Sequence, residues 1–221
     1  MQVLYQDNRI LVCIKPAGVV STDEPGGMPD LIRDHLGDEC ACVRAVHRLD
    51  QAVSGVMVYA RSRMAASILS QQVREHTMQK TYLAVIDGAP AERSGVLRDL
   101  LWRDTKARMT RVVDAPGKNV QPAELSYELL ASIFGRSLLK IRLATGRTHQ
   151  IRVQLASRGI PIAGDNKYGR GEECPVALWS YRLCFRHPQT GAPVSFSCPP
   201  PAVFPWTAFD LPHLIAQSED A

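Results

Sequence analysis

Short apolar runs bounded by turn residues recur along this chain, and they limit its fold more than any other feature. Runs such as ILVCIK, GVMVYA and YLAVI have the length of strands, and glycine, proline or an Asp-Asn pair separates them. Strands are predicted within residues 3–15, 55–61, 80–88, 123–144 and 177–199. Short turns between such runs favour antiparallel pairing over a doubly wound pattern. The sequence therefore predicts an α+β chain with a mixed, largely antiparallel sheet and flanking helices.

Three segments have helical spacing. They span residues 28–37, 62–76 and 148–159. Ser62 and Thr148 are the predicted N-caps of the second and third helices, and Gly37 and Gly159 are predicted to end the first and third. The second helix is expected to bury one apolar stripe, formed by Met64, Ile68, Leu69 and Val73.

Residues 90–122 are polar and are broken by prolines and glycines, so we expect a hairpin or a flexible excursion there. Residues 206–221 are predicted to form a weakly helical, acidic tail. No linker or internal repeat is visible, and 221 residues suit one domain with a sizeable core. We expect a single catalytic domain over residues 1–221.

The cysteines and the apolar segments exclude several classes of protein. None of the six cysteines forms a C-x-x-C motif, and no cysteine–histidine set has the spacing of zinc ligands. No signal peptide opens the chain, and no apolar run approaches the ~18 residues of a membrane span. We therefore expect a reducing, cytoplasmic location, a monomer, no membrane and no metal.

Positive charge is concentrated in one part of the sequence. Residues 136–170 hold eight basic residues and one acidic residue, Asp165, although the whole chain carries only +4. The basic residues are Arg136, Lys140, Arg142, Arg147, Arg152, Arg158, Lys167 and Arg170. Such a stretch indicates a polyanionic partner such as a nucleic acid, and the alternative is a solvated face with internal ion pairs.

Three ionisable side chains precede a buried-strand candidate in the segment AVHRLDQAVSGVMVYARS, residues 45–62. If the HRLD residues are extended, Arg48 and Asp50 point to one side and Leu49 points to the other. Leu49 can then pack in the core while Arg48 and Asp50 face a cleft. The alternative is a surface arginine and aspartate that flank a strand.

A second polar cluster lies in the segment ATGRTHQIRVQLASRGIPIAGDNKYG. Arg147 precedes the predicted helix, whose first backbone N–H groups would attract an anion. His149 and Arg152 share one face of that helix. A buried arginine needs a partner, because an unpaired buried charge is costly, and Asp50 is the natural candidate for Arg152.

Five stretches together resemble the RluA family of RNA pseudouridine synthases. In chain order they are DNRILVCIKPAGVV, VHRLDQAVSGVMVYARS, QKTYLAVIDG, ATGRTHQIRVQLASRGIPIAGDNKYG and RHPQTGAPVSFSCPPP. The resemblance covers roughly residues 3–205, and the HRLD…SG and TGRTHQIR blocks are specific as a pair. It implies the pseudouridine synthase fold with a central active-site cleft. It also implies an enzyme that isomerises uridine in structured tRNA or rRNA without a metal or cofactor, of the short type that lacks an S4 domain.

The resemblance also implies the site residues. Asp50 resembles the essential aspartate of the family, Tyr82 resembles the active-site tyrosine, and Arg152 resembles the arginine that pairs with the aspartate. Arg48 resembles the arginine that replaces the flipped base in the RNA stack. The other RNA contacts are expected at Arg136, Lys140, Arg142, Arg147, His149 and Lys167.

These residue types suit the reaction. A carboxylate such as Asp50 is ionised at neutral pH, so it can attack the sugar C1′, attack the base or act as a base on the sugar. Tyr82, which by itself would be an ordinary core tyrosine, offers a flat face for uracil and a hydroxyl for proton transfer. His47 and His149 are interpreted as structural or backbone-contacting, and Lys15 in KPAG is expected near the site.

Two other functions remain open at this point. A non-catalytic RNA-binding protein or RNA chaperone could reuse the fold, although a buried carboxylate facing phosphates would weaken its binding. A glycosidase-like hydrolase would need a second carboxylate in the same cleft, and neither Asp165 nor Glu128 lies in a block that indicates that role.

Overall fold

The computed structural model describes residues 1–172 and 174–219. The chain falls into two compact units. Unit 1 comprises residues 1–80 with 179–198, and unit 2 comprises residues 81–178 with the segment from Pro199 onward. The expectation of a single catalytic domain stays a prediction.

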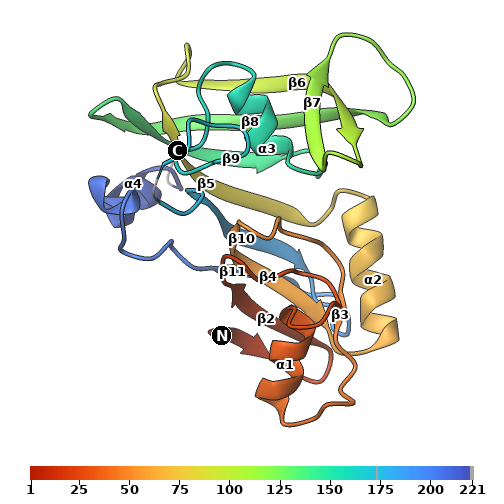
Figure 1. The fold of residues 1–221 in the computed structure, drawn as a ribbon. Helices are drawn as coiled ribbons and strands as arrows, with labels where there is room; N and C mark the ends of the chain where they lie inside the picture. Colours follow the sequence, from red (N-terminus) through yellow and green to blue (C-terminus); the bar gives the residue numbers. More distant parts are fainter. Residues whose placement is uncertain (173, 220–221) are drawn as a thin grey trace. The chain divides into compact units, whose positions relative to one another are not determined.

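Unit 1 is built on a mostly antiparallel sheet that two helices accompany (Figure 1). Its elements are β1 (Val3–Gln6), β2 (Ile10–Lys15), α1 (Met28–Leu36), β3 (Arg44–Ala45), β4 (Ser54–Ala60), α2 (Arg63–Arg74), β10 (Leu178–Arg186) and β11 (Pro193–Ser197). The strand order is β1-β2-β4-β10, with β3 paired to β4 and β11 paired to β10. Only β4 and β10 run parallel among these pairs of the described chain.

The N-terminal hairpin forms where the sequence predicts it. Oδ1 of Asp7 accepts hydrogen bonds from the backbone N–H groups of Arg9 at 2.7 Å and Ile10 at 2.8 Å, which satisfies the turn. The apolar side chains of Leu11 and Val12 that follow are fully buried. Two strands around an Asp-Asn turn are therefore confirmed.

The helices of unit 1 confirm the predicted ends and part of the predicted stripe. Helix α1 is followed by Gly37, whose φ of 64° lies in the left-handed region. Oγ of Ser62 accepts from the backbone N–H of Ala65 at 3.1 Å and caps α2. Met64 was predicted to be buried but is 56% exposed. Leu69 is fully buried and Val73 packs against the same cluster, as predicted. Ala65, four residues before Leu69 and so on the same face, takes the place expected for Met64.

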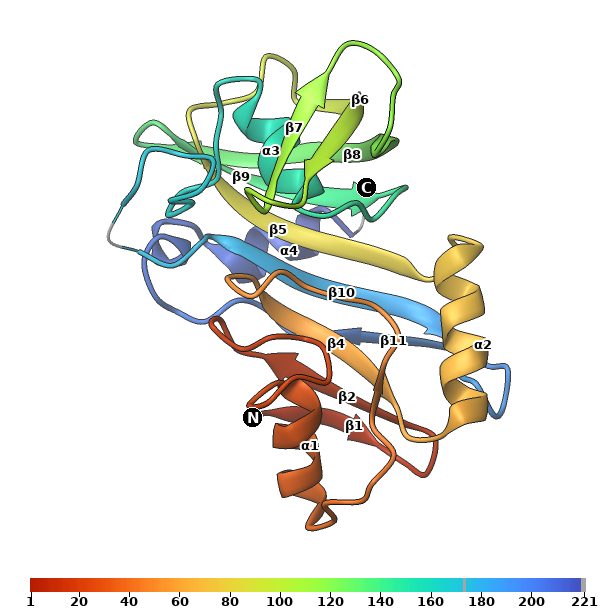
Figure 2. The same ribbon diagram turned by 45° about the vertical axis from the view of Figure 1, so that its right-hand side comes forward.

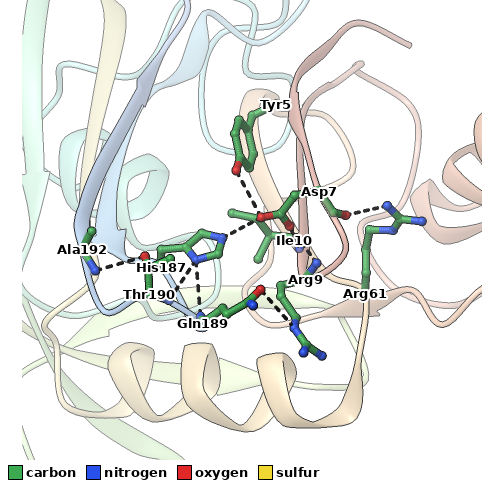
Figure 3. Close-up of polar contacts among 9 residues, drawn as sticks. All are labelled: Tyr5, Asp7, Arg9, Ile10, Arg61, His187, Gln189, Thr190 and Ala192. Carbon is green, nitrogen blue, oxygen red and sulfur yellow. Dashed lines mark hydrogen bonds and ion pairs between the residues drawn. The ribbon is translucent and has the colours of Figure 1, made fainter.

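A polar cluster ties two turns of unit 1 together (Figure 3). Oδ2 of Asp7 accepts from the hydroxyl of Tyr5 at 3.1 Å and lies 2.9 Å from Nε2 of His187. The other ring nitrogen, Nδ1, accepts from the backbone N–H groups of Gln189 at 3.3 Å and Thr190 at 3.4 Å. Because Nδ1 accepts, Nε2 carries the proton and donates to Asp7. The β1–β2 turn is thereby joined to the β10–β11 turn.

Unit 2 is built on a five-stranded antiparallel sheet (Figure 2). Its elements are β5 (Gln79–Asp87), β6 (Ser94–Asp104), β7 (Met109–Val113), β8 (Val120–Ile133), β9 (Arg136–Leu143), α3 (Gln150–Ala156), a 3-10 turn (Trp206–Ala208) and α4 (Leu211–Gln217). The strand order is β5-β9-β8-β6-β7. Of the two outcomes expected for residues 90–122, the hairpin is confirmed, because β6 pairs with β7. Helix α3 packs against β6 and β7, and α4 packs against β8.

Helix α3 is shorter than predicted, and Thr148 is not its N-cap. The helix spans Gln150–Ala156, and the N-cap is His149 with a left-handed φ of 56°. The carbonyl oxygen of Thr148 accepts from the hydroxyl of Thr110 on β7 at 3.0 Å, which holds this residue in the turn before the helix. The helix also stops three residues before Gly159, whose φ of 75° redirects the chain. The tertiary contact to β7 thus overrides the local capping signal.

The remaining predicted elements are confirmed. Phe134 and Gly135 form the turn between β8 and β9, and the late strands and the helical tail are present. Within the residues that the structure describes, no helix has both the length and the apolar character that a membrane span needs.

Candidate active site

The HRLD segment of unit 1 alternates between buried and exposed side chains, as an extended chain should. His47 and Leu49 are each 6% exposed. Arg48 is exposed and Asp50 is half-buried. The predicted burial of Leu49 is confirmed, and the prediction that Arg48 and Asp50 face a cleft stays a prediction.

Main-chain hydrogen bonds hold this segment in place. Oγ of Ser21, which is buried, accepts from the N–H of Leu49 at 3.1 Å and donates to its carbonyl oxygen at 2.8 Å. The N–H of Val53 donates to the carbonyl oxygen of Asp50 at 3.0 Å and closes a turn behind the carboxylate. The position of Asp50 along the chain is therefore fixed through its neighbours' backbone.

Lys15 is completely buried beside the same turn, as expected from the KPAG stretch. Its ammonium donates to the carbonyl oxygens of Pro16 at 2.8 Å and Gln51 at 3.1 Å, so it joins the two loops. Burial lowers the pKa of Lys15 to about 8, and the nearby charge of Asp50 opposes this shift. Lys15 thus places a positive charge close to Asp50 within unit 1.

His47 has the structural role that the sequence indicates. Its Nε2 accepts from the backbone N–H of Val58 on β4 at 3.2 Å. Burial, followed by the charge of Lys80, lowers the pKa of His47 to about 3. The ring is therefore neutral near pH 7 and carries its proton on Nδ1.

Tyr82 lies in β5 of unit 2 and is 5% exposed. It is paired with Ile141 of β9, which in turn is paired with Tyr127 of β8. Paired residues point to the same face of a sheet, and their chain neighbours point to the other face. Tyr82 therefore defines one face of the unit 2 sheet.

Arg152 is held by Asp165, a partner that the sequence reasoning missed. Nε of Arg152 lies 2.7 Å from Oδ2 of Asp165, and Nη2 lies 2.8 Å from Oδ1. The side chains are 6% and 0% exposed. Burial alone would raise the pKa of Asp165, but Arg152 and two backbone N–H groups lower it overall. The pairing of Arg152 with Asp50 stays a prediction.

Tyr168 completes the surroundings of Arg152. The guanidinium carbon lies 5.2 Å from the centre of the Tyr168 ring, within the range of a cation–π contact. The hydroxyl of Tyr168 accepts from the backbone N–H of Thr110 at 2.8 Å and lies 2.6 Å from Nδ1 of His149. His149 and Arg152 thus both contact Tyr168, as expected for residues on one side of α3, and the role of His149 stays a prediction.

Arg147 lies in the turn before α3, but its surroundings differ from the predicted anion site. Its backbone N–H donates to the side chain of Gln150 at 2.9 Å, and its Nε donates to the carbonyl oxygen of Pro122 at 3.1 Å. The helix that follows has only seven residues. The binding of RNA at Arg147 stays a prediction that depends on its side chain.

The basic stretch divides between the two faces of the unit 2 sheet. In β9, the cationic residues pair with residues of β5 that alternate with Tyr82, so they point to the opposite face. These residues are Arg136, Lys140 and Arg142. A hollow of about 350 Å³ on this part of the sheet is lined by Lys140 and Arg142 together with Glu128 and residues of β6.

Several cations of this stretch already have protein partners. Arg136 lies within 3.2 Å of Asp87 and also pairs with Glu172, whereas the ammonium of Lys140 donates to the carbonyl oxygen of Ser218 at 2.6 Å. Lys167 is exposed, and its backbone N–H donates to Asp165. The alternative of internal ion pairs is therefore correct for part of the stretch.

Sequence reasoning also missed a basic hairpin tip outside that stretch. The β6–β7 hairpin carries four basic residues within nine positions, and α3 packs beside it. They are Arg103, Lys106, Arg108 and Arg111. A count of charges over a shorter window would have found them, because only Asp104 interrupts the run.

Comparison with known proteins agrees with this arrangement. Residues 9–157 match the family model described as RNA pseudouridylate synthase. The chain is 36% identical over 212 residues to an uncharacterized RNA pseudouridine synthase of Bacillus subtilis, YhcT, covering 91% of this chain and 69% of that protein. It is 35% identical over 207 residues to the dual-specificity RNA pseudouridine synthase RluA of Yersinia pestis, covering 90% of this chain and 98% of that protein.

Solved structures show the same fold. Human RNA pseudouridylate synthase domain containing 1 superposes with a TM-score of 0.80 at 21% identity, covering all of this chain and 95% of that one. Human RNA pseudouridylate synthase domain containing 4 gives 0.76 at 23% identity, covering 90% and 88%. The motifs, the fold and the relatives together lead to one conclusion: this chain belongs to the RluA-type RNA pseudouridine synthases, which are isomerases.

Proposed function

We propose that this chain isomerises specific uridines of structured tRNA or rRNA to pseudouridine. The observation that carries the proposal is the half-buried carboxylate of Asp50, held by main-chain bonds next to an exposed arginine and a buried lysine. The names of relatives support the substrate class. One is the dual-specificity RluA of Yersinia pestis, and another, 33% identical, is the ribosomal large subunit pseudouridine synthase D of Neisseria meningitidis.

Asp50 is the proposed reacting carboxylate. It needs no base to activate it, because a carboxylate is ionised at neutral pH. Arg152 is proposed to pair with it and orient it, and the clamp of Asp165 and Tyr168 supports this role because it fixes the guanidinium plane. Tyr82 is proposed to stack on the uracil and to transfer a proton late in the reaction.

Arg48 is proposed to fill the gap that the target nucleotide leaves when it flips out of the RNA. Unstacking a base costs a few kcal/mol, and a guanidinium plane can replace it in the stack. The exposure of Arg48 supports this role, because a side chain that intercalates must reach solvent in the free protein.

The proposed phosphate contacts fall into two groups. Arg147, His149 and Lys167 lie on or next to α3 and are proposed to hold RNA near the target uridine. Arg136, Lys140 and Arg142 point away from the Tyr82 face of their sheet, so they are proposed to contact a more distant part of the RNA. We also propose a cytoplasmic location and a monomer, consistent with the reduced state of all six cysteines.

The test is a pseudouridine map of total tRNA and rRNA from cells with and without the gene. We expect one or a few positions to lose pseudouridine on deletion and to regain it when the wild-type gene is restored. Identical maps would overturn the proposal and favour a non-catalytic RNA-binding role.

A further inference from the structure

A lysine close in sequence to the proposed active site has no counter-ion among the residues that the structure describes. Lys80 is the second residue of β5, and it precedes the proposed stacking residue Tyr82 by two positions. Residues two apart in a strand point to the same side, so Lys80 extends along the strand in the direction of the Tyr82 side chain. Neither the function proposed above nor the family resemblance gives Lys80 a role.

The surroundings of Lys80 are partly buried and hold no acidic partner. The side chain is half-buried, and its ammonium makes no hydrogen bond or ion pair with the residues that the structure describes. Burial lowers the pKa of Lys80, and no neighbouring carboxylate opposes that effect. A lysine in such a position is normally paired, because burying a charge without a partner is unfavourable.

A second donor of unit 1 lies near Lys80, which belongs to the same unit. Val46 and Met78 belong to the same apolar cluster, and the charge of Lys80 helps to lower the pKa of His47, so His47 and Lys80 lie near each other. Nδ1 of His47 carries a proton, because Nε2 accepts from Val58, and Nδ1 has no hydrogen-bond partner among the described residues. An ammonium and an N–H donor without an acceptor favour an anion as the missing partner.

We propose that the ammonium of Lys80 binds a backbone phosphate of the substrate RNA at the target uridine. This inference rests on the proposed function, since it takes RNA to be the substrate. Chain distance supports the choice of phosphate: His47 is three residues before Asp50 and Lys80 is two before Tyr82. An anion bound here is therefore next to the residues proposed to act on the nucleoside.

The phosphate contact gives Lys80 a positioning role. It holds the backbone of the flipped nucleotide while Tyr82 and Asp50 act on the base and sugar. A charged hydrogen bond of this kind is worth about tenfold or more in binding. A lysine that only extends its ammonium into water along an apolar surface would contribute no specific phosphate contact.

A double-mutant cycle between the protein and the RNA tests the proposal. The full chain, as wild type and as Lys80→Met, is assayed on a synthetic stem-loop that contains the mapped uridine. A second stem-loop carries a neutral methylphosphonate in place of the phosphate 5′ or 3′ to that uridine. We expect one of the two replacements to lower the RNA affinity and the single-turnover rate of the wild type by about tenfold. The same replacement should change the affinity and the rate of Lys80→Met by less than about twofold.

Two further variants make the cycle specific. Lys80→Arg keeps the charge and should recover most of the affinity and the sensitivity to the replaced phosphate. Lys106→Met removes an exposed charge at the β6–β7 turn, and its effect should simply add to that of the methylphosphonate.

Additive effects of Lys80→Met at both phosphates would overturn the inference while leaving the proposed function intact. If wild-type protein converts neither the normal nor the modified RNA, the proposed function fails instead, so the two failures are distinguishable.

Discussion

The two halves of the candidate site are held in different ways. In unit 1, the side chains of Ser21 and Lys15 hydrogen-bond the main chain of the loops around Asp50. In unit 2, side-chain contacts hold Arg152 itself: a two-point ion pair with Asp165 and the face of the Tyr168 ring. The first half is held through its main chain, and the second is held through the side chain of Arg152.

This difference predicts where substitutions are tolerated. A backbone-held segment keeps its shape when one side chain changes, because several main-chain bonds share the constraint. A guanidinium in a two-point ion pair with a buried carboxylate loses part of its orientation when that carboxylate is lost. Apart from Asp50 itself, substitutions around the site should therefore lower the reaction rate more in unit 2 than in unit 1.

Apart from Asp50, the largest effect is expected for Arg152→Ala. The single-turnover rate should fall by about 100-fold or more, because a displacement of about 1 Å at a reacting group has that effect, while RNA affinity should stay within about threefold. Circular dichroism must first establish a folded fraction, since Asp165 is left buried. Arg158→Ala is the matched control, because Arg158 pairs with Asp99 but is 34% exposed. A near-normal rate for Arg152→Ala would refute the positioning role.

Asp165→Asn should destabilise unit 2 by about 3–5 kcal/mol at pH 7, because it removes one charge from the buried Arg152–Asp165 pair. The pKa of Asp165 is lower in the folded state than its usual 3.8, so its stabilisation is complete above about pH 4 and is lost as pH falls further. Urea denaturation should therefore show a difference in the free energy of unfolding between Asp165→Asn and wild type, and this difference should become smaller below about pH 4.

The control for that experiment is Asp99→Asn, because its partner Arg158 is partly exposed. The free energy of unfolding of this variant should fall by about 1 kcal/mol or less. Equal losses for the two variants would contradict the claim that burial makes the Arg152–Asp165 pair special.

Ser21→Ala tests the unit 1 half. The free energy of unfolding should fall by about 1–3 kcal/mol, because the backbone of Leu49 loses both hydrogen bonds. The rate should fall by less than about tenfold, since other main-chain bonds remain. Thr22→Ala, which removes a hydroxyl that donates to Glu24 at the surface, should change stability by less than about 0.5 kcal/mol. If Ser21→Ala lowers the single-turnover rate as much as Arg152→Ala does, the two halves of the site do not differ in their tolerance of substitution.

The smallest effect is expected for single cations of the basic stretch. Arg147→Ala should weaken RNA binding by about tenfold and reduce the slope of log affinity against log salt by about one. Arg142→Ala, on the sheet face opposite Tyr82, should weaken it by about threefold or less. If Arg142→Ala weakens RNA binding more than Arg147→Ala does, the RNA contacts the sheet face opposite Tyr82 more closely than the account proposes.

Local patterns in the sequence predicted most of the fold and the burial of Leu49 within the candidate site. The alternation in HRLD places Leu49 inside and Arg48 outside, and both hold because strand geometry is set by adjacent residues. Thr148 failed as a cap because Thr110, far away in the sequence, takes its carbonyl oxygen. Local propensity carries no information about such a contact.

The partner of Arg152 was missed for a related reason. Asp165 is separated from Arg152 by a turn, and their meeting depends on how residues 157–168 pack back on α3. Its position as the sole acid in a basic stretch was the available signal, since an acid among cations is usually paired. Which face of the sheet each β9 side chain occupies, relative to Tyr82, follows from the strand register, and the sequence does not provide that register.

The central claim is that the carboxylate of Asp50 performs the isomerisation. The most direct measurement is pseudouridine formation by Asp50→Asn under single-turnover conditions on the mapped RNA, with affinity measured in parallel. The account predicts no detectable pseudouridine and an RNA affinity within about threefold of wild type, because asparagine keeps the shape but neither attacks nor accepts a proton. Pseudouridine formation at a rate near that of the wild type would contradict the account.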